Sequence, residues 1–206
     1  MTKRAYYENG ALECEATVLR CRAVENGFEI LTDVTSIFPE SGGQLSDTGF
    51  IGNSRVTHAR EEGSEVWHLC DKAVEAGAKV KIAADAGPRL DHTQQHSGEH
   101  IVSGIVHARF GYDNVGFHLN DELCTLDLSG PLTKEELREV ENAANEAVFA
   151  NVPVQISYPS KEKLKTLDYR SKIEIDGQVR IVTIPGYDVC ACCAPHVYFT
   201  GEIGLI

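Results

Sequence analysis

The sequence predicts an α+β fold in two parts: a small N-terminal β-barrel-like domain (1–86) and an α+β domain (87–206). In the first part, short apolar runs with β-branched and aromatic residues recur about every ten residues, as in a small barrel or meander. In the second part, segments with helical spacing alternate with strand patterns and show no βαβ repeat. The 206 residues, 42% hydrophobic and 24% charged, suffice for one large or two small globular domains.

The first part contains five expected strands and one glycine-rich loop. The strands are expected at 13–20, 27–34, 54–59, 65–69 and 79–82, with the hairpin signal Glu25-Asn26-Gly27 between the first two. The loop FPESGGQLSDTG (38–49) has paired glycines that permit positive φ or close approach to a ligand. No Lys-Ser or Lys-Thr follows them, so it is not a Walker-type phosphate loop. A tight turn between strands is the alternative interpretation.

The second part begins after the turn signal Asp85-Ala86-Gly87-Pro88. A helix is expected at 89–110 and a second one to about 151, which Thr133 and Glu136 open with a capping-box pattern. The strands expected around them are 115–119, 123–128, 152–158 and 178–184. The first helix is expected to carry histidines and to pack on the antiparallel sheet.

The net charge argues mildly against a nucleic-acid partner. Lys and Arg total 19 against 31 Asp and Glu, which gives −12, whereas RNA binders usually carry a basic excess. RNA binding would need a local basic face, and the alternative is a solvated helix surface. The candidates for that face are Lys161, Lys163, Lys165, Arg170, Lys172 and Arg180.

The sequence predicts a cytoplasmic protein without a membrane span. No apolar run approaches the ~18 residues that a spanning helix needs. The first residues, MTKRAYYENG, lack the apolar segment of a secretory signal. Seven cysteines is an odd number, and three of them crowd together as Cys190, Cys192 and Cys193, which favours a local thiol site in a reduced protein over a disulfide framework.

Two separated stretches together indicate a zinc site. His92 and His96 lie ~40° apart on one helix face, the spacing at which two imidazoles reach one metal. Cys192 and His196, in a loop between strands, have the types and spacing to supply two more ligands, and Zn²⁺ accepts such N and S donors tetrahedrally. The alternatives are surface or core histidines and an inert cysteine-rich turn.

The first helix lacks the general base of a zinc peptidase. Thr93, Gln94 and Gln95 separate His92 from His96, so no Glu stands where that class places it. His58 and His68 are expected to be structural, and His100 and His107 either to be structural or to contact the metal ligands from outside.

The combination of these motifs resembles the editing domain shared by alanyl- and threonyl-tRNA synthetases, and most of all its free-standing AlaX-type relatives in their medium-length form. The matching pieces are FPESGGQLSDTG, HTQQH (92–96), GFHL (116–119), CCAPH (192–196) and TGEIGLI (200–206). The resemblance implies that zinc is held by His92, His96, Cys192 and His196. It also implies that Gly42, Gly43 and Gln44 lie near the substrate, with Gln95 and His118 as candidate catalytic residues.

The resemblance further implies trans-editing: hydrolysis of the ester that joins serine or glycine to alanine tRNA. Binding alone separates such small side chains by only ~1–3 kcal/mol, which explains the need for a second, hydrolytic sieve. Asp188, just before the cysteine loop, is a candidate substrate contact or a turn-closing residue. The alternatives are a non-catalytic zinc-stabilised RNA-binding module and a metallohydrolase of small esters.

Two departures from the family pattern stand out. The usual loop is Cys-Gly-Gly-Thr-His, whereas Cys193, Ala194 and Pro195 intervene here, and Cys192 is preferred as ligand because it keeps the spacing to His196. Family members usually continue for some tens of residues after the GEIG stretch, so a C-terminally trimmed chain or a loss of closing strands is expected. With four protein ligands the zinc would be coordinatively full, which favours a positioning role.

Overall fold

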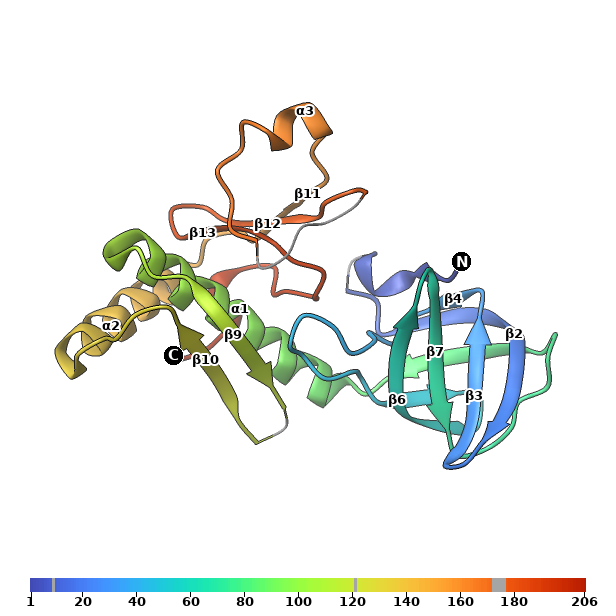
Figure 1. Cartoon of the computed structure of the whole chain (residues 1–206). Coiled ribbons are helices and arrows are strands. Elements are labelled where there is room, and N and C mark those ends of the chain that lie inside the picture. The colour runs from blue at the N-terminus through green and yellow to red at the C-terminus, as the bar shows by residue number, and fades with distance from the viewer. Residues whose placement is uncertain (9, 121, 172–176) are drawn as a thin grey trace. The chain divides into compact units, whose positions relative to one another are not determined.

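A computed structural model describes residues 1–206 except 9, 121 and 172–176, and it confirms the α+β class (Figure 1). The chain forms two compact units, Met1–Asp91 and His92–Ile206. The division falls inside helix α1 (Ala86–Phe110), whereas the sequence suggested a boundary at 86. The helix starts earlier than expected because Pro88 lies in its first turn, where the missing N–H would have no helical partner.

The first unit is a closed six-stranded barrel with the order β2-β3-β7-β6-β5-β8 (Figure 1). Its strands are β2 (Glu13–Val24), β3 (Gly27–Thr32), β5 (Gly49–Ile51), β6 (Ser54–Glu62), β7 (Glu65–Cys70) and β8 (Lys79–Ala84). Two strands that the sequence pattern did not reveal, β1 (Lys3–Arg4) and β4 (Val34–Thr35), pair in parallel. The expected hairpin turn is present: Val24 lies opposite Gly27 in the register of the two strands, and Gly27 has a φ of 135°.

Alternating residues of these strands fill the barrel. Ile30, Val56 and Ile82 are fully buried and belong to one apolar cluster, and the residues on either side of Val56 are not buried. The buried His68 belongs to the same unit and is bonded to Thr35 and to the carbonyl of Ile30. The structural role expected for His68 therefore agrees with its place in the barrel.

The glycine-rich loop of this unit ends in a tight turn. Gly42 and Gly43 have φ values of 62° and 85°, and Ser41 and Gln44 exchange backbone hydrogen bonds of 3.1 Å across them. Behind the turn, Asp47 accepts a 2.6 Å hydrogen bond from the backbone N–H of Phe38 and forms a buried ion pair with Arg89. The loop is thus held by a charge pair at its base.

The second unit combines two long helices with two small sheets (Figure 1). Besides the later part of α1 it contains β9 (Asn114–Leu119), β10 (Cys124–Leu128), α2 (Lys134–Ala150), β11 (Gln155–Ser157), α3 (Lys161–Leu164), β12 (Ile181–Ile184) and β13 (Asp188–Ala191). The capping box is confirmed: Thr133 bonds the backbone N–H of Glu136, whose carboxylate accepts from the N–H of Thr133. Strand β13 was not expected from the sequence.

The core of this unit lies between α1, α2 and the β11-β12-β13 sheet. Ile101 and Ile105 of α1 share one buried apolar cluster with Ala144 of α2 and Ile184 of β12. A side chain at Gly104 would overlap the carbonyl oxygen of Tyr187, so the glycine lets α1 approach the turn before β13. This approach brings the buried face of α1 against the cysteine-rich segment.

Within the described parts of the chain, no helix combines the length and apolarity required to cross a bilayer.

Candidate metal centre

Three imidazoles and one thiol converge in the second unit. The ligand atoms of His96, His100, Cys192 and His196 all lie within 4.8 Å of one another. Helix α1 supplies His96 and His100, which are one turn apart on its buried face, and the bend after β13 supplies the other two. The sulfur of Cys192 lies 3.5 Å from Nε2 of His96 and 3.4 Å from Nε2 of His196.

The sequence predicted His92 and His96 as the ligands from the first helix, whereas the group that converges in the structure contains His96 and His100. His92 is buried on α1 but lies outside the group. Residues 92, 96 and 100 repeat at the same i,i+4 spacing, so the sequence offers two equivalent pairs. The segment after the cysteines contacts α1 at Ser97, through the N–H of Val197, and the turn before β13 contacts α1 at Gly104, through Tyr187.

The bend that carries Cys192 is shaped by Arg180. Nη1 of Arg180 donates hydrogen bonds of 2.8 and 2.9 Å to the carbonyl oxygens of Cys192 and Ala194, and the N–H of Cys192 bonds the carbonyl of Arg180. The N–H of Ala194 also points at the Cys192 sulfur, 3.4 Å away. Arg180, expected on an RNA-facing surface, thus has a structural contact here instead.

The structure distinguishes among the three neighbouring thiols. Burial by itself would raise the pKa of Cys192, but the imidazoles of His96 and His196 hold it well below its usual value. Burial raises the pKa of Cys190 to about 11, so that thiol is protonated at neutral pH. Cys193 is not a member of the four-residue group. Cys192 is therefore the thiolate of the site, which suits a metal ligand.

Each of two ligand rings is oriented by a second residue. Nδ1 of His100 bonds Oδ2 of Asp188 at 2.8 Å, and Arg170 donates to both oxygens of that carboxylate at 2.8 and 3.0 Å. Nδ1 of His196 lies 3.0 Å from the hydroxyl of Ser97, which in turn donates to the carbonyl of Thr93. Such contacts direct the other ring nitrogen toward a metal.

The buried ion network changes the proton affinity of its members. Burial alone would lower the pKa of His100, but the hydrogen bond to Asp188 and the Cys192 thiolate raise it well above the usual range. Burial would raise the pKa of Asp188, and the bonds from His100 and Arg170 lower it. Burial, reinforced by repulsion from the His100 imidazole, lowers the pKa of His196 to about 3.

The two candidate catalytic residues do not face the group. His118 is exposed on β9, and its neighbour Phe117 is the one that packs on His96, with ring centroids 4.9 Å apart. Successive strand residues point to opposite faces, so His118 faces away. Gln95 is exposed on α1 and projects about 100° around the helix from His96. Sequence reasoning had no signal to prefer Phe117.

The other predicted substrate contacts have different settings. Gly42, Gly43 and the buried Gln44 belong to the first unit, in the turn described above. Asp188 is committed to His100 and Arg170, so it orients a ligand ring. It also lines an open pocket of about 840 Å³ in the second unit, together with Gly104, Tyr169, Tyr187 and Cys190.

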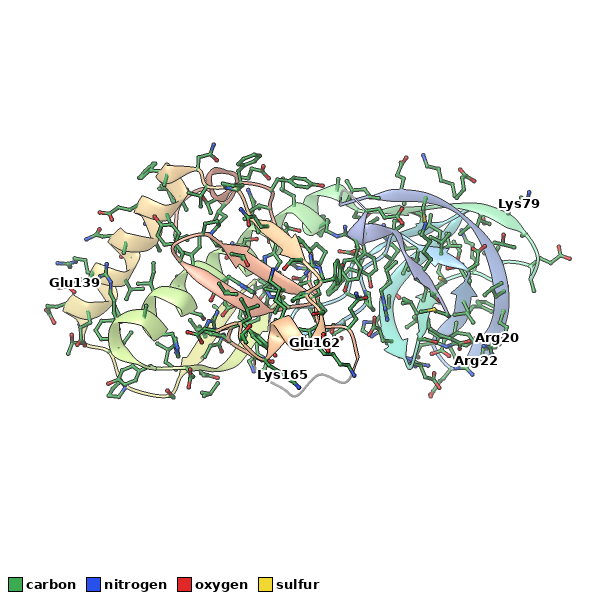
Figure 2. The ribbon with its side chains drawn as sticks, turned by 90° about the horizontal axis from the view of Figure 1, so that it is seen from above. Arg20, Arg22, Lys79, Glu139, Glu162 and Lys165 are labelled. Carbon is green, nitrogen blue, oxygen red and sulfur yellow. The ribbon has the colours of Figure 1, made fainter. Side chains whose placement is uncertain are left out.

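Some of the basic residues predicted to contact RNA bind other residues of the protein instead. Lys161, Lys163 and Lys165 are exposed on and just after α3, and Figure 2 shows Lys165 and Glu162 projecting from this short helix. Arg170 is bonded to Asp188, and Lys172 lies outside the described residues. Among the described candidates, the three lysines are therefore the exposed part of the predicted basic face.

Comparison with known proteins shows which proteins this chain resembles. Residues 179–206, which include Cys192 and His196, match the family model described as the threonyl and alanyl tRNA synthetase second additional domain. The chain is 32% identical over 185 residues to alanyl-tRNA editing protein Aarsd1-A of Xenopus laevis, which covers 88% of this chain. Most of this chain is therefore similar to alanyl-tRNA editing proteins.

Other alanyl-tRNA editing proteins and the alanine–tRNA ligases also match along most of the chain. Alanyl-tRNA editing protein Aarsd1 of Danio rerio is 34% identical over 83% of the chain. The alanine–tRNA ligase of Methanothermobacter thermautotrophicus is 35% identical over 98% of it, and the match spans 24% of that ligase. The chain spans about half the length of the curated editing proteins that it matches, 45% for the Xenopus protein.

Proposed function

We propose that this protein removes serine or glycine from wrongly charged alanine tRNA by hydrolysing the aminoacyl ester, with a zinc ion at His96, His100, Cys192 and His196. The observation that carries the proposal is the group of three imidazoles and one thiolate, half of which lies in the segment that matches the second additional domain of threonyl and alanyl tRNA synthetases. Two or more His with one Cys is a donor set that suits Zn²⁺.

The residues present fit a bound zinc ion. Four donors within 4.8 Å match a tetrahedral arrangement, and the lowered pKa of Cys192 provides the thiolate form without further cost. Asp188 and Ser97 fix the tautomers of His100 and His196 from outside the group. Zinc bound there would supply a fixed positive charge beside the ester.

The protein's own residues would position the ester and limit water at it. Phe117 covers His96 on one side, and the hydrogen bonds from Arg180 hold the bend that carries Cys192. The pocket of about 840 Å³ borders the Asp188–Cys190 side of the group and is a suitable place for the acceptor end of the RNA. Gly42, Gly43 and Gln44 are kept as proposed substrate contacts.

Lys161, Lys163 and Lys165 are proposed to contact the tRNA backbone. They are exposed and lie within five residues of sequence in an otherwise acidic chain. RNA recognition by such a face would be local and salt-sensitive.

A deacylation assay tests the proposal. The zinc-loaded protein is incubated with alanine tRNA charged with serine, glycine or alanine, and release of the amino acid is followed. Release of serine or glycine in preference to alanine is expected. Intact ester on all three tRNAs, with the tRNA still bound, would favour the non-catalytic RNA-binding module instead.

The ligand set is tested with two matched variants from the same helix. His100→Ala is expected to lose zinc and activity, because it removes one of the four donors. His92→Ala removes a buried histidine one turn before His96 and is expected to retain one zinc per chain. Zinc content, measured by elemental analysis, tells whether His100 or His92 is the ligand. If only His92→Ala loses zinc, the ligand set proposed here is rejected.

A further inference from the structure

Two exposed tyrosines lie along the chain segments next to the metal centre. Tyr198 is 52% exposed and follows the ligand residue His196 by two positions, so their Cα atoms are at most about 7 Å apart. Tyr158 is 48% exposed and lies between β11 and α3. Single exposed apolar side chains are ordinary, whereas several on one surface mark a binding site. The question is therefore whether these two rings share a surface.

The pairing of two backbone segments places both rings on one surface. The N–H of Val154 donates a 2.8 Å hydrogen bond to the carbonyl of Tyr198, and Pro153 and Phe199 form an antiparallel bridge. In this register Tyr198 lies opposite Val154, and Tyr158 follows Val154 by four residues. Alternate residues of a strand share a face, so Tyr198 and Tyr158 lie on one face, about 13 Å apart along the strand. Phe199 lies on the other face.

The backbone of Tyr198 is held on both sides. Its carbonyl is bonded to Val154, and its N–H donates a 3.2 Å hydrogen bond to a carboxylate oxygen of Glu202. The carbonyl of Glu202 in turn accepts a 2.6 Å bond from Nε2 of Gln94 on α1. A ring on a fixed backbone loses little conformational freedom when a flat ligand stacks on it.

Positive charge lies at the end of this surface that is far from the metal centre. The three exposed lysines of the α3 region, which follow Tyr158 within seven residues, are Lys161, Lys163 and Lys165. The only acid among them is Glu162, which projects from the same helix in Figure 2. At the other end, the carboxylate of Glu202 beside Tyr198 disfavours a phosphate. An unpaired RNA strand suits this arrangement, because it offers flat bases to the rings and phosphates to the lysines.

We propose that Tyr198 and Tyr158 stack on the unpaired bases at the 3′ end of the tRNA. This inference rests on the proposed function, which assigns the last nucleotide, the one that carries the ester, to the pocket beside Asp188. The nucleotide before it stacks on Tyr198, and an earlier one stacks on Tyr158, from which the RNA backbone continues to the lysines of α3. Every base has a flat π face, so the two rings select an unpaired end and not a sequence.

The test measures the binding of two uncharged RNAs to the zinc-loaded protein. One is alanine tRNA with its complete 3′ end, and the other is the same tRNA without its unpaired 3′ nucleotides. Tyr198→Leu and Tyr158→Leu remove one ring each and keep apolar bulk, whereas Tyr198→Phe keeps the ring. Phe199→Leu is the matched control, because Phe199 is 45% exposed, adjacent to Tyr198 and on the opposite face. Filter binding over a range of salt gives the affinities, and 2-aminopurine at the nucleotide before the last reports stacking by its fluorescence.

The expected result is a loss of affinity for the complete tRNA only. Each Leu variant at a tyrosine binds it about tenfold more weakly or worse, as expected for one lost stacking contact, and binds the trimmed tRNA as wild type does. The slope of log K against log salt is unchanged, because no charge is removed. The 2-aminopurine fluorescence is quenched by wild type, Tyr198→Phe and Tyr158→Leu but not by Tyr198→Leu. Phe199→Leu matches wild type throughout, and all variants keep one zinc per chain.

Several outcomes would overturn the inference. Equal weakening of both RNAs, wild-type affinity in either tyrosine-to-leucine variant, or the same loss in Phe199→Leu would show that the rings do not stack on the 3′ bases. Equal affinity of the wild-type protein for both RNAs would also reject it, and this measurement needs no variant to fold. A wild-type dimer that Tyr198→Leu dissociates in sedimentation velocity would assign the surface to a second copy of the chain. If the wild type releases serine from charged tRNA yet fails these tests, only the role of the tyrosines falls. If it neither deacylates nor binds alanine tRNA, the proposed function falls as well.

Discussion

Asp188 accepts a 2.8 Å hydrogen bond from Nδ1 of His100 across 88 residues of sequence, and it thereby selects which nitrogen of that ring faces the metal centre. Arg170 holds the carboxylate with two further bonds. The chain Arg170–Asp188–His100 is a carboxylate–histidine arrangement of the kind that raises the basicity of a metal-bound imidazole.

Asp188→Asn is expected to weaken zinc binding by about 10- to 100-fold, because contacts that orient a ligand typically contribute that much. The amide keeps an oxygen for His100 but loses the charge that pairs with Arg170. Chelator competition on the folded protein measures the affinity. Asp168→Asn, at an exposed position, is the control for the same chemical change. Unchanged zinc affinity in Asp188→Asn would show that the hydrogen bond does not orient the ligand.

The buried pair at the base of the glycine-rich loop predicts a large stability effect. The Asp47 and Arg89 side chains are 1% and 6% exposed, and Asp47 also accepts from the N–H of Phe38. Asp47→Ala leaves the guanidinium buried without its counter-charge, which typically costs about 3–5 kcal/mol of unfolding free energy. Urea denaturation followed by circular dichroism measures the change.

The control for Asp47→Ala is Glu62→Ala, which breaks the exposed Arg60–Glu62 pair of the same barrel. An effect below about 1 kcal/mol is expected there, because water screens such a pair. Similar losses for both variants would contradict the special role given to the buried pair.

Elements with local signals were predictable from the sequence. The capping box of Thr133 and Glu136, the hairpin turn at Gly27 and five of the six strands of the barrel follow from turn chemistry and alternation, and all of these are present. The missed strands β1, β4, β5 and β13 have two to four residues each. Such strands exist only because distant partners pair with them, so no local pattern indicates them.

The residue types of the candidate metal group were predictable from the sequence, whereas the helix pair that joins Cys192 and His196 in it differs from the predicted pair. Residue types and spacing pointed to histidines on the first helix and to Cys192 with His196, yet His92, His96 and His100 are equivalent by periodicity. The packing of α1 against the Tyr187 turn at Gly104 places His100 beside Asp188, a contact that periodicity does not indicate. Small residues on that face were the available signal, because they mark where another backbone approaches. The roles of Asp188 and Arg180 depend on tertiary contacts alone.

His68 predicts a pH dependence of stability in the barrel. Burial, partly opposed by the hydrogen bond to the Ile30 carbonyl, lowers its pKa from 6.5 to about 4. The unfolded chain therefore binds a proton between these values while the folded chain does not, and stability falls as the pH drops from about 6.5 to 4. The contribution is complete above pH 6.5 and amounts to about 3 kcal/mol over the whole interval.

The free energy of unfolding is measured by urea denaturation for wild type and His68→Gln at several pH values between 7.5 and 4.5. The slopes of this free energy against pH are then compared between the two proteins. Other titrating groups are common to both proteins and cancel. Gln keeps a donor and an acceptor for Ile30 and Thr35 but does not titrate. Parallel curves for the two proteins would mean that His68 does not contribute to the acid sensitivity.

The lysines of α3 predict a specific salt dependence of tRNA binding. Lys161, Lys163 and Lys165 are exposed, and each backbone phosphate that they neutralise would release counterions. Replacing all three by Gln is expected to weaken tRNA binding at low salt and to reduce the slope of log K against log salt by about 2. Filter binding from low to moderate salt gives both quantities.

The matched control replaces Lys72, Lys79 and Lys134, which are exposed elsewhere on the chain, and changes the net charge by the same amount. If the slope depends only on net charge, both triple variants lower it equally, and α3 is not the RNA face. If only the α3 variant changes it, the acidic chain binds RNA through this local face. Hydrolysis of a free serine ester by the α3 variant should then equal that of wild type, because none of the three lysines belongs to the metal centre.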